Sequence, residues 1–367
     1  MRVALLHPTY WPEIRRGSER LVHDLATELA ARGHDTTILT SHPGRSTEDR
    51  EDGHVVVRSR RLRQPPTLGL HEDFLGNVPA VIWRVLRGGY DVVHAFHLAY
   101  AWAAVRARRL GGPPVVFSFH GMPLRRELVA RRYRLEMLQS TVAGAAASAV
   151  LSESAAEPFR RYLLREPEIL AGGVRSADFE TGESRVPEPT IVCAASIGDH
   201  RKRGDLLVGA FAALRERRPD ARLRIVRTPD PLMSPHRLDL PDGAEWVEAD
   251  TTGDLAREYA RGWVSALTSV DEPFGLVLVE SLAAGTPVVA TDSGACPEIL
   301  TEPSHGRLFG VDDDVALVDA LDAALARPPS EEDAAACRAR AGQFDWARIA
   351  ERYEGVYERV IRTGAAA

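Results

Sequence analysis

Short apolar runs alternate with amphipathic stretches along the first half of the chain. Arg2–Leu6 is typical of a short buried strand. It is followed by a helix whose leucines and valine recur at helical spacing before Gly33 ends it. Further short strands are predicted at Thr36–Thr40, Val55–Val57, Val92–His94, Val115–Phe119 and Ala149–Leu151. Strand–helix alternation of this kind indicates a mostly parallel sheet covered by helices on both faces.

The polar, proline-containing stretch Ser176–Thr190 interrupts the pattern and is predicted to link two domains. The alternation then restarts, with strands predicted at Ile191–Ala195, Leu223–Val226, Val264–Val270 and Pro287–Thr291. A closing amphipathic helix covers Trp346–Ile361. We therefore expect an α/β protein of two Rossmann-like, doubly wound domains, residues 1–178 and 185–345. Ligands bind beyond the carboxyl ends of strands in such sheets, so two facing sheets predict a central cleft.

Composition narrows the function classes. A chain of 367 residues is long enough for two cores. The net charge of −6 gives no positive excess for a nucleic-acid partner. No apolar stretch reaches the length of a membrane span, and three unpaired, widely spaced cysteines indicate a reducing compartment. We expect a cytoplasmic protein.

The most informative segment is Asp271–Leu300, DEPFGLVLVESLAAGTPVVATDSGACPEIL. It predicts a strand end, a tight loop and a helix start, at which the N–H groups of Phe274, Gly275 and Leu276 are free to bind phosphate. Glu280 lies five residues after Gly275, about 7.5 Å further along the helix axis. This spacing lets Glu280 accept hydrogen bonds from ribose hydroxyls, while Glu272 stays near a sugar.

A bound pyrophosphate needs more positive charge than a helix terminus supplies, because the terminus contributes only about half a charge. The segment Ser196–Gly204 follows the first strand of the second half and offers Arg201, Lys202 and Arg203. Lys202 is the only lysine in an arginine-rich chain. We therefore predict Lys202 and Arg201 as phosphate ligands, without deciding which of the three cations dominates.

In its context, the pair Glu272 and Glu280 resembles the E-x7-E signature of retaining glycosyltransferase family 4, whose members have the GT-B fold. The resemblance extends over most of the chain, in motifs that are spread through both halves: GSER (17–20), RGHD (32–35), DVVHAFH (91–97), FHGMP (119–123), SES (152–154), AGGV (171–174), GRLFGVDDD (306–314) and FDWARIAERYEGVY (344–357). Two departures stand out. Arg16 precedes a lone Gly17 where the family has two glycines, and Ala195–Ser196 replaces a Gly-Arg pair, for which Arg201 is expected to substitute.

The resemblance implies that the last helix, residues 346–367, packs back on the first domain. It also implies that His120, in a post-strand loop, touches the transferred sugar and acts with Glu272 in catalysis, and that Gly17 lets the backbone approach the donor phosphate or the acceptor. His94 and His97 are weaker candidates for ligand binding, and Glu19 is assigned to the helix start. The arginine-rich stretch Leu124–Leu135 offers membrane contact, but a solvated helix is favoured.

These features predict transfer of a hexosyl group from a nucleotide sugar, expected to be UDP-linked, to a hydroxyl of a small-molecule acceptor. The resemblance implies retained configuration by front-face attack, without a metal or cofactor. An acceptor in natural-product biosynthesis is favoured. Alternatives on the same fold are a nucleotide-sugar 2-epimerase, a phosphorylase or a non-catalytic sugar-nucleotide-binding protein. A dehydrogenase is disfavoured because no G-x-G-x-x-G follows the first strand, and an α/β-hydrolase because G-x-S-x-G is absent.

Overall fold

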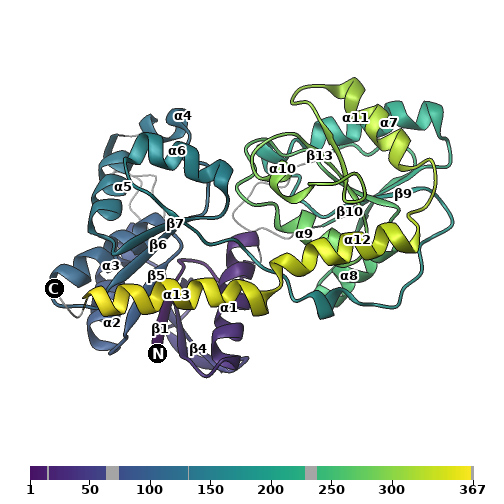
Figure 1. Cartoon of the computed structure of the whole chain (residues 1–367). Helices are drawn as coiled ribbons and strands as arrows, with labels where there is room; N and C mark the ends of the chain where they lie inside the picture. The colour runs from purple at the N-terminus through teal and green to yellow at the C-terminus, as the bar shows by residue number, and fades with distance from the viewer. Residues whose placement is uncertain (15, 63–73, 131, 228–237, 365–367) are drawn as a thin grey trace. The chain divides into compact units, whose positions relative to one another are not determined.

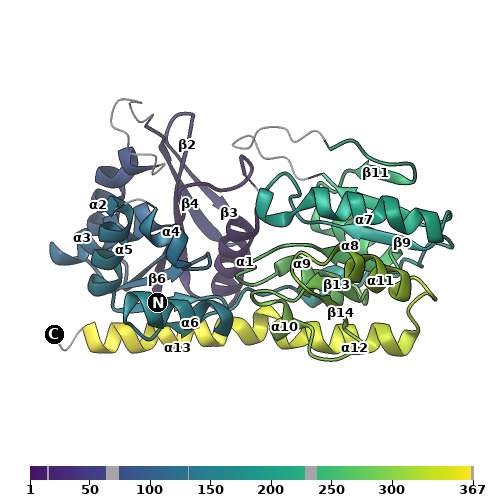
Figure 2. The ribbon, with the colours of Figure 1, turned by 90° about the horizontal axis from the view of Figure 1, so that it is seen from above.

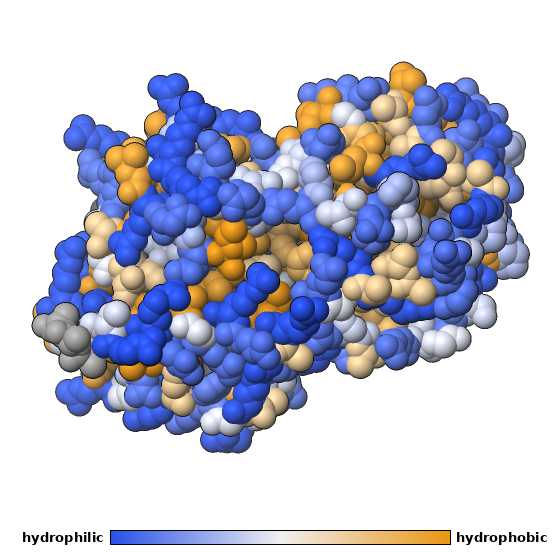
Figure 3. All heavy atoms as spheres, in the orientation of Figure 1, coloured by the Kyte–Doolittle hydropathy of each residue, from blue (hydrophilic) through white to orange (hydrophobic). Residues whose placement is uncertain are grey.

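The computed structural model describes residues 1–14, 16–62, 74–130, 132–227 and 238–364. Within these residues the chain forms two compact units, Met1–Ala171 with Trp346–Ala367, and Gly172–Asp345. Each unit is an α/β layer structure (Figure 1). Hydrophilic residues cover most of the visible surface (Figure 3), and no helix in the described part of the chain is long and apolar enough to span a membrane.

The first unit is built on a sheet that is eight-stranded among the described residues, in the order β3-β4-β2-β1-β5-β6-β7-β8. Its strands are β1 (Arg2–Leu6), β2 (Asp35–His42), β3 (Thr47–Glu51), β4 (His54–Arg60), β5 (Val92–Ala95), β6 (Val115–Phe119), β7 (Ala147–Val150) and β8 (Glu168–Ile169). All pairings are parallel except β3 with β4. The central strands are buried, as continuous apolar runs predict.

Helices cover both faces of this sheet (Figure 2). They are α1 (Gly17–Ala31), α2 (Val78–Arg87), α3 (Leu98–Arg109), α4 (Arg125–Val129), α5 (Arg132–Gly144), α6 (Glu153–Leu163) and α13 (Trp346–Gly364). The closing helix α13 lies against α1, β5 and β6. Its buried Tyr357 hydroxyl shares a 2.7 Å hydrogen bond with His94, and Tyr353 donates to the carbonyls of Leu170 and Ala171. These contacts make the end of the chain part of the first core.

The second unit has a parallel sheet, six-stranded in the part that the structure describes, in the order β11-β10-β9-β12-β13-β14. Its strands are β9 (Thr190–Cys193), β10 (Arg222–Val226), β11 (Ala244–Val247), β12 (Val264–Leu267), β13 (Val288–Thr291) and β14 (Gly306–Phe309). Its α-helices are α7 (Gly204–Arg217), α8 (Thr252–Arg261), α9 (Leu276–Ala283), α10 (Cys296–Ile299), α11 (Asp314–Ala324) and α12 (Glu331–Ala341). The strand order reverses at β9, so the loops after β9 and β12 meet at the switch point where such sheets bind ligands.

The boundary between the units lies earlier than residue 178, the end predicted for the first domain. The first unit ends at Ala171, and the following residues belong to the second. Phe179 is buried there, with its ring 6.5 Å from that of Tyr259. Within the predicted linker, Val186 is also bonded to the second unit, because its carbonyl accepts a 2.8 Å hydrogen bond from the Trp263 indole. The buried Phe179 ring and this hydrogen bond attach the segment to the second unit, although its polar composition indicated a linker between domains.

Candidate active site

The turn between β12 and α9 has the form that its sequence predicts. Asp271 and Gly275 both have positive φ, 54° and 89°, and Gly275 is the N-cap of α9. A side chain on Gly275 would also press within 2.8 Å of Leu278. Among the described residues, the backbone N–H groups of Phe274, Gly275 and Leu276 have no hydrogen-bond acceptor. The turn therefore presents adjacent donors at a helix N-terminus, the arrangement that binds phosphate.

The next loop of the sheet fixes this turn. The Glu272 carbonyl accepts a 2.8 Å hydrogen bond from Ala295 N–H, and the Ser293 hydroxyl accepts one of 3.0 Å from Asp271 N–H. Gly294 packs directly on the turn, since a Cβ there would lie 2.3 Å from the Glu272 carbonyl oxygen and 2.5 Å from its nitrogen. Only glycine allows this approach at a φ of 58°.

Glu272 and Lys202 form a buried ion pair. The Lys202 Nζ lies 2.5 Å from Glu272 Oε2, and their side chains are 19% and 9% exposed. Burial alone would raise the pKa of Glu272. The charge of Lys202 and its hydrogen bond outweigh that influence and hold the pKa below its ordinary value. Glu272 is therefore a carboxylate, able to accept hydrogen bonds from sugar hydroxyls, and Lys202 joins it to the loop after β9.

The two arginines beside Lys202 are engaged differently. Arg201 forms a 2.7 Å ion pair with Asp199 at the surface, with about half of the arginine side chain exposed. Arg203 pairs with Asp312 at 2.6 Å. Of the three cations proposed for phosphate, Lys202 is the one paired with a residue of the β12–α9 turn. The structure thus brings Lys202, Glu272, Phe274, Gly275 and Leu276 together in one corner of the second unit.

Glu280 lies on α9 with a fully buried side chain. Its Oε2 is 3.5 Å from the Tyr259 hydroxyl, a long distance for an O–H···O bond. A carboxylate at this depth favours ligands that donate hydrogen bonds, since donors offset the cost of burying its charge.

In the first unit, His120 follows β6 and is partly buried. Its ring lies 5.1 Å from that of Phe96, and among the described residues its Nε2 has no hydrogen-bond partner. Burial, aided by the nearby His7, lowers the pKa of His120 to about 3. The side chain is therefore neutral at physiological pH. Gly17 begins α1, and a Cβ there would meet nothing within 4 Å, so close packing does not require this glycine.

His94 and His97 have structural partners. His94 is fully buried and bonds Ser118 and Tyr357, both at 2.7 Å. His97 caps α3, because its Nδ1 accepts from Ala99 N–H at 3.3 Å. These contacts account for both side chains without a ligand.

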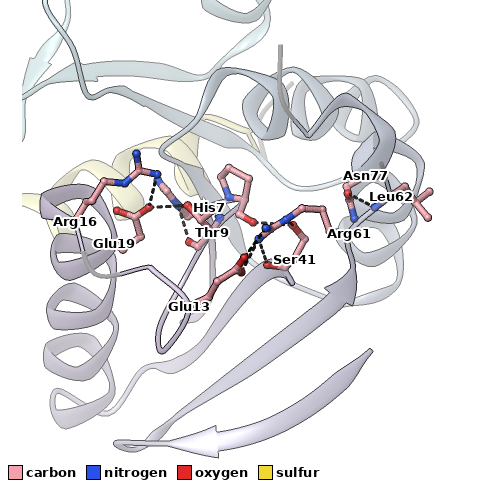
Figure 4. Close-up of polar contacts among 10 residues, drawn as sticks. His7, Thr9, Glu13, Arg16, Glu19, Ser41, Arg61, Leu62 and Asn77 are labelled. Atoms are coloured by element: carbon pink, nitrogen blue, oxygen red, sulfur yellow. Dashed lines mark hydrogen bonds and ion pairs between the residues drawn. The ribbon is translucent and has the colours of Figure 1, made fainter. Parts of the chain in front are cut away.

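A polar cluster around the β1–α1 loop was not predicted from the sequence (Figure 4). Glu19 is completely buried and accepts hydrogen bonds from Thr9 at 2.6 Å and Ser18 at 2.9 Å, and Arg16 lies 3.6 Å away. The His7 Nδ1–H donates a 2.7 Å hydrogen bond to the Thr9 carbonyl. The assignment of Glu19 to the helix start missed this network, which ties the loop to α1. No part of the sequence pattern marked His7.

No group of three or more metal-ligating side chains is placed to hold a metal ion in the described ranges.

Comparison with known proteins identifies the family. The model for Glycosyltransferase Family 4 matches residues 15–176, and that for Glycosyl transferases group 1 matches residues 175–343. The chain belongs to glycosyltransferase family 4. It is an enzyme, a glycosyltransferase that acts on a nucleotide sugar.

Individual relatives can be aligned with this chain over nearly its whole length. The chain is 28% identical to a D-inositol 3-phosphate glycosyltransferase of Actinosynnema mirum, over 93% of this chain and 91% of that protein. It is 26% identical to a phosphatidyl-myo-inositol mannosyltransferase of Mycobacterium leprae, over 100% and 98%. A sucrose-phosphate synthase structure from Thermosynechococcus elongatus matches with a TM-score of 0.83, at 21% identity and 99% coverage of both chains. These matches confirm the GT-B fold predicted from the sequence.

Proposed function

We propose that this glycosyltransferase transfers a hexosyl group from a UDP-sugar to a hydroxyl of a small-molecule acceptor, with retention of configuration and without a metal. The observation that carries the proposal is the buried Lys202–Glu272 pair beside the open N–H groups of the β12–α9 turn. It combines a cation, oriented backbone donors and a carboxylate in one corner, which suits a sugar linked to a diphosphate.

In this proposal the diphosphate binds at the N-terminus of α9, on the N–H groups of Phe274, Gly275 and Leu276. Lys202 supplies the charge that the helix terminus lacks, and Arg201 supports it by exchanging Asp199 for a phosphate oxygen. Glu272 accepts hydrogen bonds from hydroxyls of the transferred sugar, while Glu280 accepts them from the ribose. Both glutamates are acceptors in this arrangement.

The first unit contributes His120 and Gly17 by family resemblance. His120 is proposed to hydrogen-bond the transferred sugar as a neutral imidazole, consistent with its lowered pKa. Gly17 is proposed to let the donor phosphate or the acceptor approach the backbone closely. The space around its Cα is open, since a Cβ there would meet no atom within 4 Å.

The chemistry proposed is front-face displacement. A covalent double displacement needs a free carboxylate nucleophile, whereas Glu272 is held by Lys202 and Glu280 is assigned to the ribose. The acceptor oxygen instead attacks the anomeric carbon on the face from which the diphosphate departs, and a leaving phosphate oxygen takes the acceptor proton. The protein positions the substrates and stabilises the charge that develops on the leaving group. An inverted product would overturn this mechanism.

The acceptor is proposed to be a small polyol. The names of the two inositol-related relatives support a cyclitol, and a natural-product acceptor remains the alternative drawn from the sequence.

A thermal-shift panel of UDP, GDP, dTDP and ADP tests the donor site. At a ligand concentration of about 100 Kd, binding stabilises the folded state by about 2.7 kcal/mol. For a unit of this size that corresponds to roughly 5–10 °C. We expect UDP to produce this shift in the parent. In Glu280→Gln most of the UDP-induced shift should be lost.

The matched control is Glu258→Gln, which alters a carboxylate of similar burial that pairs with Arg224 in the same unit. This variant should keep the nucleotide-induced shift relative to its own baseline. A larger shift with another nucleotide would overturn the UDP assignment, and an unchanged shift in Glu280→Gln would overturn the ribose assignment.

A further inference from the structure

Four side chains share one face of the sheet in the first unit, at the ends of two neighbouring strands. His94 of β5 and Phe96 just after it lie on the same face, because side chains alternate along a strand. Ser118 of β6 and His120 just after it lie on that face too, since β5 and β6 pair in parallel. Two cross-strand pairs result: His94 with Ser118, and one step further along the strands Phe96 with His120.

Hydrogen bonds fix the first pair. The His94 ring shares a 2.7 Å bond with the Ser118 hydroxyl through Nε2, and another of 2.7 Å with the Tyr357 hydroxyl of α13 through Nδ1. Burial lowers the pKa of His94 well below its ordinary value, so the ring is neutral and donates through one nitrogen while it accepts through the other. The ring is fully buried, and turning it would leave a polar atom without a partner.

Packing, rather than hydrogen bonding, holds the second pair. The Phe96 ring stacks on His94, with centroids 4.0 Å apart and an interplanar angle of 29°, and it also contacts His120 with centroids 5.1 Å apart. Among the described residues the His120 Nε2 has no hydrogen-bond partner. Phe96 is buried, and close-packed rings transmit a displacement from one contact to the next. The orientation of His94 therefore reaches His120 through Phe96.

We infer that Phe96 is a positioning residue for His120, and that the Tyr357 hydroxyl of the closing helix fixes this arrangement through His94. The inference rests on the proposed function, in which His120 hydrogen-bonds the transferred sugar. It gives α13 a part in the reaction beyond its packing in the first core. The effect on rate can be large, because a misplacement of about 1 Å can cost about a hundredfold in rate.

Tyr357→Phe is the most selective test, because it removes one hydroxyl and keeps the ring, whose centroid lies 5.6 Å from that of His94. The change leaves the His94 Nδ1 without its partner, so the His94 ring should reorient and shift Phe96 with it. Phe96→Leu removes the contact with His120 directly.

Tyr353→Phe is the matched control. Tyr353 lies one turn earlier on α13, is fully buried and has its ring 5.8 Å from that of His94. Its hydroxyl donates to the carbonyls of Leu170 and Ala171 instead of bonding His94. Both tyrosine variants lose one buried hydroxyl, so both should be destabilised to a similar degree, and only Tyr357→Phe should disturb His120.

NMR spectra of the full chain with isotope-labelled histidine measure this disturbance directly. The ring signals of His120 are identified by their loss in His120→Gln. They should shift in Phe96→Leu, which removes the magnetic field of the Phe96 ring, and also in Tyr357→Phe, while in Tyr353→Phe they should stay in place. Unshifted His120 signals in Tyr357→Phe, or equal shifts in the two tyrosine variants, would overturn the inference.

Hydrolysis of UDP-glucose and UDP-galactose without an acceptor measures the consequence for the reaction. Tyr357→Phe should lower kcat about tenfold and Phe96→Leu up to about a hundredfold, with parental kcat in Tyr353→Phe. UDP lacks the transferred sugar, so all of these variants should bind it like the parent. In a His120→Gln background neither change should lower kcat further, because both act through His120. A further loss in that background would mean that Phe96 and Tyr357 act on the fold and not on His120.

The two measurements separate this inference from the proposed function. If the parent binds UDP and hydrolyses a UDP-hexose, while Phe96→Leu and Tyr357→Phe do so at the parental rate, the inference fails and the proposed function stands. If the parent does not bind UDP, the proposed function fails and the inference fails with it. Where hydrolysis is too slow to follow, the His120 signals decide.

Discussion

Removing the cation of the Lys202–Glu272 pair tests whether this buried ion pair stabilises the fold of the second unit. Lys202→Met retains an apolar side chain of similar length and leaves Glu272, which is 7% exposed, without its 2.5 Å partner. Breaking a buried pair by removing one member costs roughly 3–5 kcal/mol. We expect roughly 3 kcal/mol, the lower end of that range, because Lys202 keeps some contact with water.

The assay is scanning calorimetry at pH 7.5, in which the transition of the second unit is followed. For a unit of this size each kcal/mol shifts the Tm by about 2–4 °C, so the expected decrease is roughly 6–12 °C. Lys202→Met with Glu272→Gln should recover most of the loss, because no buried charge remains. Arg201→Met is the control: the Arg201 side chain is about half exposed in its pair with Asp199, and the loss of this pair should cost less than about 1 kcal/mol.

The effect should depend on pH in a defined direction. In the parent, the folded pKa of Glu272 is depressed, so the pair stabilises the fold above the unfolded pKa, and this contribution is lost as pH falls through the folded pKa. Without Lys202, burial raises the pKa of Glu272 instead, and the penalty disappears once the carboxyl is protonated. The difference between the parent and Lys202→Met should therefore shrink from pH 7.5 toward pH 4. A pH-independent difference, or equal losses in the single and double variants, would refute the reasoning.

Much of the fold could be predicted from the sequence because parallel strands are buried on both faces and appear as apolar runs. The runs at Val92–His94 and Val115–Phe119 fall within β5 and β6. Strand β3 (Thr47–Glu51, TEDRE) was not predicted, since it is exposed and almost wholly charged. It forms by antiparallel pairing with β4 at the sheet edge, and no hydrophobic periodicity records such a pairing.

Some features of the candidate site could likewise be predicted from the sequence, and others could not. The β12–α9 turn could be predicted because its glycine, its glutamates and its helix start are adjacent in sequence. The pair between Lys202 and Glu272, which are 70 residues apart, could not be predicted. Each charge could be assigned to ligand binding from its own segment, but no pattern in the chain indicated that the two side chains touch.

Two further predictions concern packing and protonation near the proposed site residues. Gly294→Ala puts a Cβ 2.3 Å from the Glu272 carbonyl oxygen, so it should displace the turn and weaken UDP binding more than tenfold in calorimetric titration. Gly209→Ala is the control, because Gly209 lies within α7 and a Cβ there would meet no atom within 4 Å. This variant should bind UDP normally and be about 0.5–1 kcal/mol more stable than the parent. Parent-like binding by Gly294→Ala would contradict the contact. For His120, burial lowers the folded pKa to about 3 from 6.5, so the unfolded chain binds more protons between these values and the parent loses stability as pH falls below 6.5. His120→Gln lacks this loss, and denaturant unfolding should show its stability relative to the parent rising by roughly 1–2 kcal/mol between pH 7.5 and pH 5. An unchanged difference would mean that His120 is protonated as readily in the folded protein as in the unfolded chain, and the neutral imidazole proposed for sugar binding would then be wrong.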